Sequence, residues 1–127
     1  MEIVRRGYDA YNRGDLDGFG ELLAPDAIAH PLPYWPEAGA RHGREAILGL
    51  LREIREPLER NESAPEKLVD GDDQVVTAHL WRGVLKGTND EVEARVGMVV
   101  TIRAGKIAEL RWFRTFDDAL EAAGLRE

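Results

Sequence analysis

Residues 92–116 read VEARVGMVVTIRAGKIAELRWFRTF. Two runs rich in β-branched and aromatic residues flank a short turn that contains Gly105, a pattern that predicts a β-hairpin of long strands. Side chains alternate between the two faces of a strand, so each run places one set of residues on the same face. An apolar sheet face needs a cover, and a pocket would lie between the two. In the first run the residues on one face are Val92, Ala94, Val96, Met98, Val100 and Ile102, and in the second run they are Ala108, Leu110, Trp112, Arg114 and Phe116.

The rest of the chain is expected to supply that cover. Apolar residues at helical spacing predict three helices, over residues 2–12, 16–23 and 43 to about 56. Short extended runs are expected at 27–30 and near 67–69, a long strand at 74–85, and a loop at 59–66. Residues 117–124 predict a short capped helix that ends at Gly124. Helices followed by a meander of strands indicate an α+β fold, with helices on one face of a curved antiparallel sheet.

Composition limits the class of protein. The 127 residues, 43% hydrophobic and 32% charged, fit one globular domain over residues 1–127. The chain has no apolar run long enough to cross a membrane and no signal-peptide pattern at its start. The lack of cysteine excludes disulfides and thiol catalysis and fits a cytoplasmic protein. A net charge of −7 without a basic stripe argues against nucleic-acid binding.

Five short motifs occur in order along the chain: YNRGDLD at 11–17, LAPDA at 23–27, HGREAI at 42–47, RAGKI at 103–107 and DDALEAAGL at 117–125. Together they resemble the SnoaL-like group of the nuclear transport factor 2 superfamily, over about residues 3–125. The resemblance implies a cone of bent antiparallel sheet, with about four to six strands and three N-terminal helices on its concave face. It also implies a homodimer, formed through the outer sheet face.

Members of that superfamily include ketosteroid isomerase, polyketide cyclases, epoxide hydrolases, dehydratases and binding domains without catalysis, so the fold does not choose an activity. In ketosteroid isomerase an Asp acts as general base while a Tyr and a protonated Asp hold the enolate. The resemblance puts the base at His30, the Tyr at Gly7 and the protonated Asp at Met98. Steroid isomerisation by that mechanism is therefore not expected.

Two residues are the candidates for catalysis. His30 ends an extended run beside the Pro-rich loop 31–41, and an imidazole with a pKa near 6.5 suits proton transfer at neutral pH. The alternative is a histidine that only bonds loop carbonyls. Arg114 falls in the inward set of its strand, where a guanidinium would steady negative charge on a ligand. The alternative is an internal ion pair or a residue at the rim.

Flat or soft apolar side chains are the expected substrate contacts, although core packing explains some of them equally well. Ala78, Leu80 and Arg82 lie on the opposite face of strand 74–85 from His79 and Trp81, and Val75 and Val76 leave the orientation open. We expect His79 on the outer face. His42 is expected to be structural, and the histidines lack metal-ligand spacing. The expected contacts are Tyr8, Tyr11, Trp35, Met98, Leu110 and Trp112.

The sequence thus predicts a pocket for a small, largely apolar, cyclic molecule. If the protein is an enzyme, the expected reaction is an isomerisation, cyclisation or dehydration by proton transfer, without cofactor or metal, in which His30 is base or acid and Arg114 steadies charge. A non-catalytic binding protein for a hydrophobic metabolite is one alternative. A dimeric interaction module with a filled interior is another.

Overall fold

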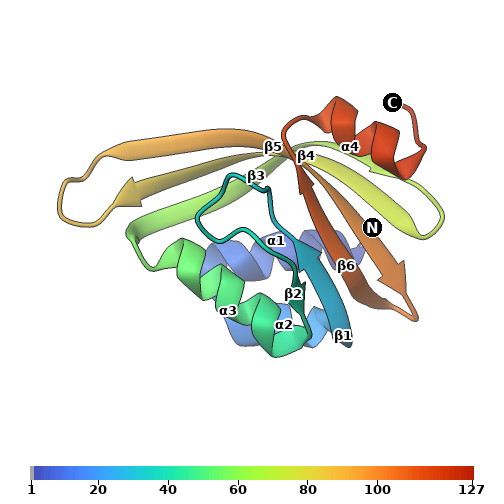
Figure 1. Ribbon diagram of the computed structural model, residues 1–127, viewed down its shortest axis with the longest axis horizontal. Coiled ribbons are helices and arrows are strands. Elements are labelled where there is room, and N and C mark those ends of the chain that lie inside the picture. The colour runs from blue at the N-terminus through green and yellow to red at the C-terminus, as the bar shows by residue number, and fades with distance from the viewer. Residues whose placement is uncertain (1) are drawn as a thin grey trace.

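A computed structural model describes residues 2–127 and contains one curved six-stranded sheet with helices on both faces (Figure 1). The order of strands across the sheet is β2-β1-β6-β5-β4-β3, and all neighbours are antiparallel except β1 and β6. The predicted α+β class is therefore confirmed, with one parallel pair added. The strands are β1 (Leu23–His30), β2 (Arg41–His42), β3 (Leu58–Asp70), β4 (Gln74–Leu85), β5 (Glu91–Arg103) and β6 (Lys106–Phe113).

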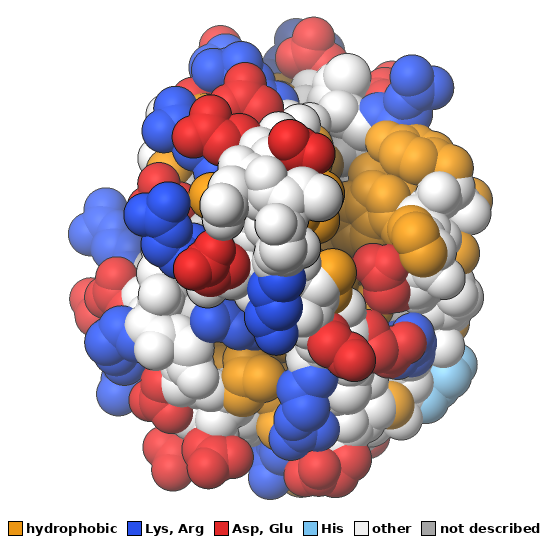
Figure 2. All heavy atoms as spheres, turned by 90° about the vertical axis from the view of Figure 1, so that its left-hand side faces the viewer, with side chains coloured by type: hydrophobic (Ala, Val, Ile, Leu, Met, Phe, Trp, Pro, Cys, Tyr) orange, Lys and Arg blue, Asp and Glu red, His pale blue; other side chains and the backbone are white. Residues whose placement is uncertain are grey.

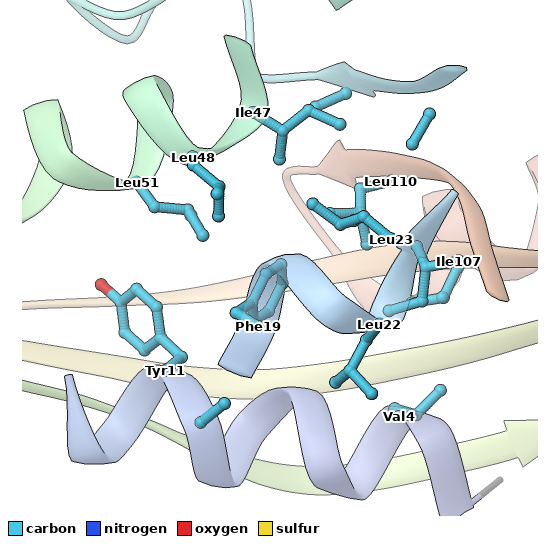
Figure 3. Close-up of a cluster of buried hydrophobic side chains, with 14 of the residues drawn as sticks. Val4, Tyr11, Phe19, Leu22, Leu23, Ile47, Leu48, Leu51, Ile107 and Leu110 are labelled. Carbon is cyan, nitrogen blue, oxygen red and sulfur yellow. The ribbon is translucent and has the colours of Figure 1, made fainter. Parts of the chain in front are cut away.

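The three predicted N-terminal helices are α1 (Glu2–Arg13), α2 (Leu16–Leu22) and α3 (Arg44–Arg55), and they lie on one side of the sheet (Figure 1). Their apolar faces meet the concave face of the sheet in a single cluster, and Figure 3 shows side chains of α1, α2, α3, β1 and β6 pointing toward one another there. Asp15 caps α2 by accepting a hydrogen bond from the Gly18 N–H. The labelled members of the cluster are Val4, Tyr11, Phe19, Leu22, Leu23, Ile47, Leu48, Leu51, Ile107 and Leu110.

The hairpin predicted from residues 92–116 is formed by β5 and β6, which pair Met98 with Trp112 and Val100 with Leu110. Ala104 and Gly105 turn the chain with φ of 52° and 77°, the left-handed conformation that a tight hairpin turn requires. The register shifts after Thr101. Because of this irregularity Ile107, and not the predicted Ala108, joins Leu110 in the interior cluster.

Helix α4 (Phe116–Ala123) lies on the opposite, outer face of the sheet (Figure 1). Thr115 caps its first turn by accepting from the Asp118 N–H, and Gly124 ends it with a φ of 71°, as predicted from the sequence. Ala119 and Leu120 pack on Val76 and Val99. At this end of the sheet both faces of β4 and β5 are therefore covered.

The crossing of α4 over β5 depends on Gly97. A Cβ atom at this position would lie 2.4 Å from the Thr115 carbonyl oxygen, a backbone atom that cannot move aside alone. We expect Gly97→Ala to lower the free energy of unfolding by about 1–3 kcal/mol, measured by urea denaturation. Gly49→Ala, in a helical position with no atom within 4 Å of the added Cβ, is the control and should be neutral or slightly stabilising. Equal stability of the two variants would contradict this close packing.

Two segments differ from the sequence prediction. Residues 59–66, predicted as a loop, belong to β3, and residues 23–26 belong to β1. β3 is an edge strand with β4 as its one neighbour, so it needs few apolar residues and shows no apolar alternation. Its register shifts between Pro65 and Lys67, where proline can be accommodated because an edge strand does not need every N–H.

Candidate functional site

A cavity of about 250 Å³ lies between the concave face of the sheet and the helices. At about 30 Å³ per water molecule, this space equals that of roughly eight waters, enough for a compact molecule of one or two rings. Figure 2 shows a hollow lined by hydrophobic side chains on the side of the molecule where the β4–β5 hairpin ends. Pro36, Glu37, Ile54 and Trp81 line both the cavity and a shallower groove beside it, so the cavity opens there.

All six of the predicted contact residues lie on the wall of this cavity. Tyr8 and Tyr11 come from α1, and Met98, Leu110 and Trp112 come from β5 and β6. Trp35, in the loop that follows β1, lies 5.9 Å from Trp112 between ring centroids, with the rings tilted by 57°. Whether these side chains touch a ligand stays a prediction.

His30 is not among the residues that line the cavity. Ala29 points into the core and is fully buried, so the next residue of β1 points to the opposite face. There the His30 Nε2 lies 3.3 Å from the Glu109 carboxylate, and 42% of its side chain is exposed. The expected place of His30 beside the pocket was wrong, because position along a strand does not fix which face a side chain takes.

Arg114 also lies outside the cavity lining, and the inward position predicted for it was wrong. Strand β6 ends at Phe113, and the chain then bends toward the cap residue of α4, so the alternation that holds for Leu110 and Trp112 stops before Arg114. Its guanidinium is exposed and lies 5.8 Å from the centre of the Tyr34 ring. This contact belongs to the surface of the molecule.

His79 takes the interior position instead, which corrects the expectation that it lies on the outer face. It is 5% exposed and lines the cavity together with Trp81. The Tyr8 hydroxyl lies 2.8 Å from the His79 Nδ1 and 2.7 Å from the Thr77 Oγ1. The rings of Tyr8 and His79 meet edge to face with centroids 5.4 Å apart. Helix α1 and strand β4 are thus joined by a buried hydrogen-bond network of Thr77, Tyr8 and His79 at the cavity wall.

The protonation states of His79 and Tyr8 follow from their burial. Burial lowers the pKa of His79 to about 4, opposed by the negative charge of Glu66, and it raises the pKa of Tyr8 well above its usual range. Both side chains are therefore neutral at neutral pH. Within residues 2–127 the lining contains one carboxylate, that of Glu37, and no lysine or arginine.

A second polar contact joins the same two elements, α1 and β4, at neighbouring positions. The Trp81 Nε1–H donates to the Tyr11 hydroxyl at 3.3 Å, and the Arg55 guanidinium lies 5.1 Å from the centre of the Tyr11 ring. Burial raises the pKa of Tyr11, and Trp81 and Arg55 partly offset that rise. The side-chain amide of Asn12 donates to the Ser63 carbonyl oxygen at 2.9 Å and accepts from the Ser63 N–H at 2.7 Å, and these two bonds fix α1 to β3. The aromatic wall is therefore set before a ligand enters.

Over the described residues, 2–127, no group of three or more histidine or acidic side chains is arranged to hold a metal ion. Among the four helices of that same range, none has the length and apolar character needed to cross a bilayer.

A family model described as a SnoaL-like domain matches residues 4–110. An NTF2-like protein of unknown function from Burkholderia pseudomallei is 21% identical, with a TM-score of 0.79 over 95% of this chain and 94% of that one. A putative polyketide cyclase from Sinorhizobium meliloti is 22% identical, with a TM-score of 0.74 over 88% and 94% of the two chains.

A third solved structure is that of a hypothetical protein from Catenulispora acidiphila with a ketosteroid isomerase-like fold, in complex with trimethylamine. It is 20% identical, with a TM-score of 0.79 over 98% of this chain and 94% of that one. No curated protein matches the chain in sequence. At these identities the structural likeness shows a shared fold.

Proposed function

This chain belongs to the SnoaL-like domain family, and from that premise we propose that it binds a small, largely apolar, ring-containing molecule and catalyses a cofactor-free proton transfer on it. The observation that carries the proposal is the cavity of about 250 Å³, whose wall is aromatic and aliphatic with a few neutral polar groups and one acidic residue, Glu37. One fold neighbour is named a putative polyketide cyclase and another has a ketosteroid isomerase-like fold, which agrees with this reaction class.

Glu37 is the group proposed to move the proton. Glu37 lines the cavity with Trp35 and Pro36, in the loop that leads from β1 to β2, and it is partly exposed. A carboxylate held next to a bound ring can take a proton from a carbon beside a carbonyl and return it at another position. His30 and Arg114, which were expected to do this chemistry, have no contact with the cavity and are not part of the proposal.

Proton transfer can be measured with 1-indanone, a two-ring ketone of suitable size, by following deuterium exchange at its C2 position in D₂O by NMR. We expect the wild-type protein to accelerate exchange over buffer, and Glu37→Gln to lower the acceleration by about 100-fold or more, because the amide cannot accept the proton. Glu56→Gln is the matched control, since Glu56 lies on the adjoining groove and not on the cavity wall.

A non-catalytic binding protein is the second candidate, favoured by the scarcity of charge in the lining. Indanone that binds without any acceleration of exchange would support it and contradict catalysis. Mass spectrometry of small molecules extracted from the purified protein would identify the natural ligand in either case. The interaction module with a filled interior is not proposed, because the interior contains the cavity. A homodimer through the part of the outer face that α4 leaves open remains a separate proposal, tested by sedimentation.

A further inference from the structure

We infer that His79 and Tyr11 both meet the ligand as hydrogen-bond donors, so that the cavity selects a neutral molecule whose polar group is an acceptor, above all a ring carbonyl. The inference rests on the proposed function for the presence of a ligand, and it adds the chemical class of that ligand. It follows from counting the hydrogens of three hydroxyl groups and one imidazole.

Thr77 is fully buried in β4. Its hydroxyl has one hydrogen, and its single side-chain partner among residues 2–127 is the Tyr8 hydroxyl at 2.7 Å. A buried hydroxyl hydrogen without an acceptor costs about 1–3 kcal/mol. The Thr77 hydroxyl therefore donates to the Tyr8 oxygen.

The direction of this hydrogen bond fixes the direction of the next one, between Tyr8 and His79. Tyr8 accepts from Thr77, so its own hydrogen goes to its other partner, the His79 Nδ1 at 2.8 Å. Nδ1 must then be the unprotonated nitrogen, and a neutral imidazole carries its hydrogen on the other nitrogen, Nε2. The reverse direction, in which Nδ1–H donates to Tyr8 and Tyr8 donates to Thr77, would leave the Thr77 hydrogen without an acceptor.

His79 Nε2–H is consequently a donor on a residue of the cavity wall, and no described residue accepts from it. Burial lowers the pKa of His79, so the ring is neutral at neutral pH and carries one N–H hydrogen. A neutral imidazole used as a donor can polarise a carbonyl, whereas the same ring would be a poor base.

Tyr11 supplies the second donor. Its oxygen accepts the Trp81 Nε1–H, and because the indole nitrogen can only donate, the Tyr11 hydrogen is not used in that bond. No acceptor for it occurs among residues 2–127, and Tyr11 lines the cavity. Neither hydrogen is used in a side-chain hydrogen bond among residues 2–127, and both residues line the cavity, so a ligand oxygen placed there can accept from them.

These donors also suit the proposed reaction. When the C–H bond beside a carbonyl breaks, its proton goes to the base and its electron pair forms a C=C bond, which places negative charge on the oxygen. Donors that hold this oxygen bind the enolate more strongly than the ketone, so they accelerate the step without carrying charge themselves. An arginine in the wall is not needed for this.

The tautomer of His79 can be observed directly in the ligand-free protein. Long-range ¹H–¹⁵N correlation spectra distinguish the two neutral forms, and the spectrum of His79→Gln assigns the signals. We expect the Nε2–H pattern in the wild type and in Thr77→Ser, which keeps the hydroxyl. Tyr8→Phe removes the donor to Nδ1 and should shift the pattern toward a mixture. A dominant Nδ1–H form in the wild type would overturn the inference.

Ligand selectivity tests the same point with matched probes: 1-indanone carries an acceptor, indole carries a donor and indane carries neither. We expect indanone to bind about 3–10-fold more tightly than indane by titration calorimetry, and indole to show no such gain. Tyr11→Phe should reduce the ratio of indanone affinity to indane affinity, because it removes one of the two donors.

The outcomes separate the two proposals. Indane or indole binding as tightly as indanone would overturn the donor inference while ligand binding stands. Failure of all three probes to bind would contradict the proposed function, and the tautomer measurement would then decide the donor inference alone.

Discussion

Replacement of Trp112 by alanine is expected to weaken the binding of 1-indanone by about 30-fold, the equivalent of a loss of about 2 kcal/mol. Trp112 lies on the cavity wall from β6, pairs with Met98 across the sheet and contacts the ring of Trp35. Truncation removes the indole surface that a flat ligand would cover and also releases Trp35, which would then lose its neighbour. The dissociation constant would be measured by titration calorimetry with ligand in excess.

Phe113→Ala is the matched control, because Phe113 is the next residue of β6 and packs on the outer face with the cluster under α4. This variant should lose stability without loss of indanone affinity. If both variants lower the affinity equally, the effect of Trp112→Ala is a loss of fold rather than of ligand contact, and the cavity is not the binding site.

The stability of the protein should fall as the pH is lowered through the range between the two pKa values of His79. Its pKa is about 4 in the folded protein and near 6.5 when unfolded, so above that range the ring is neutral in both states. Within the range the unfolded chain binds a proton that the folded protein does not. Between pH 7.5 and pH 4.5 this linkage removes about 2–3 kcal/mol from the free energy of unfolding.

Other groups also titrate in this interval, so the measurement is a comparison of urea denaturation at the two pH values in three proteins. His79→Gln should lose about 2–3 kcal/mol less than the wild type on acidification, because the amide does not titrate. His42→Gln, at an exposed position of β2, should behave as the wild type. An unchanged pH dependence in His79→Gln would show that the ring is not buried as described.

The hairpin β5–β6 was predictable because Ala94, Val96 and Met98 alternate with non-apolar or small residues and the turn contains Gly105, so local pattern and tertiary contact agree. The orientation of β4 was not predictable. Val75 packs in the interior and Val76 packs under α4, so both faces of the strand are apolar at that end and the alternation that would place His79 disappears.

The candidate site, too, was predictable only in part from the sequence. Its aromatic wall could be predicted because large apolar side chains on an inward stripe have nowhere else to go. The buried chain from Thr77 through Tyr8 to His79 joins residues 69 and 71 positions apart, and no spacing in the sequence reveals such a contact. Glu37 was missed because a single acidic residue in a loop looks like any solvated charge.

The edge strand β3 affects how copies of this protein can associate. An uninterrupted row of free amides along an exposed strand would let one molecule after another add on, and the result would be fibres. Here Pro65 lacks an amide hydrogen, and the register shift beside it bends the strand, so an incoming strand could not align along its whole length. The Asn12 side chain also occupies the backbone N–H and C=O of Ser63, so the free edge of this thirteen-residue strand is interrupted at two neighbouring positions and does not favour strand-by-strand association.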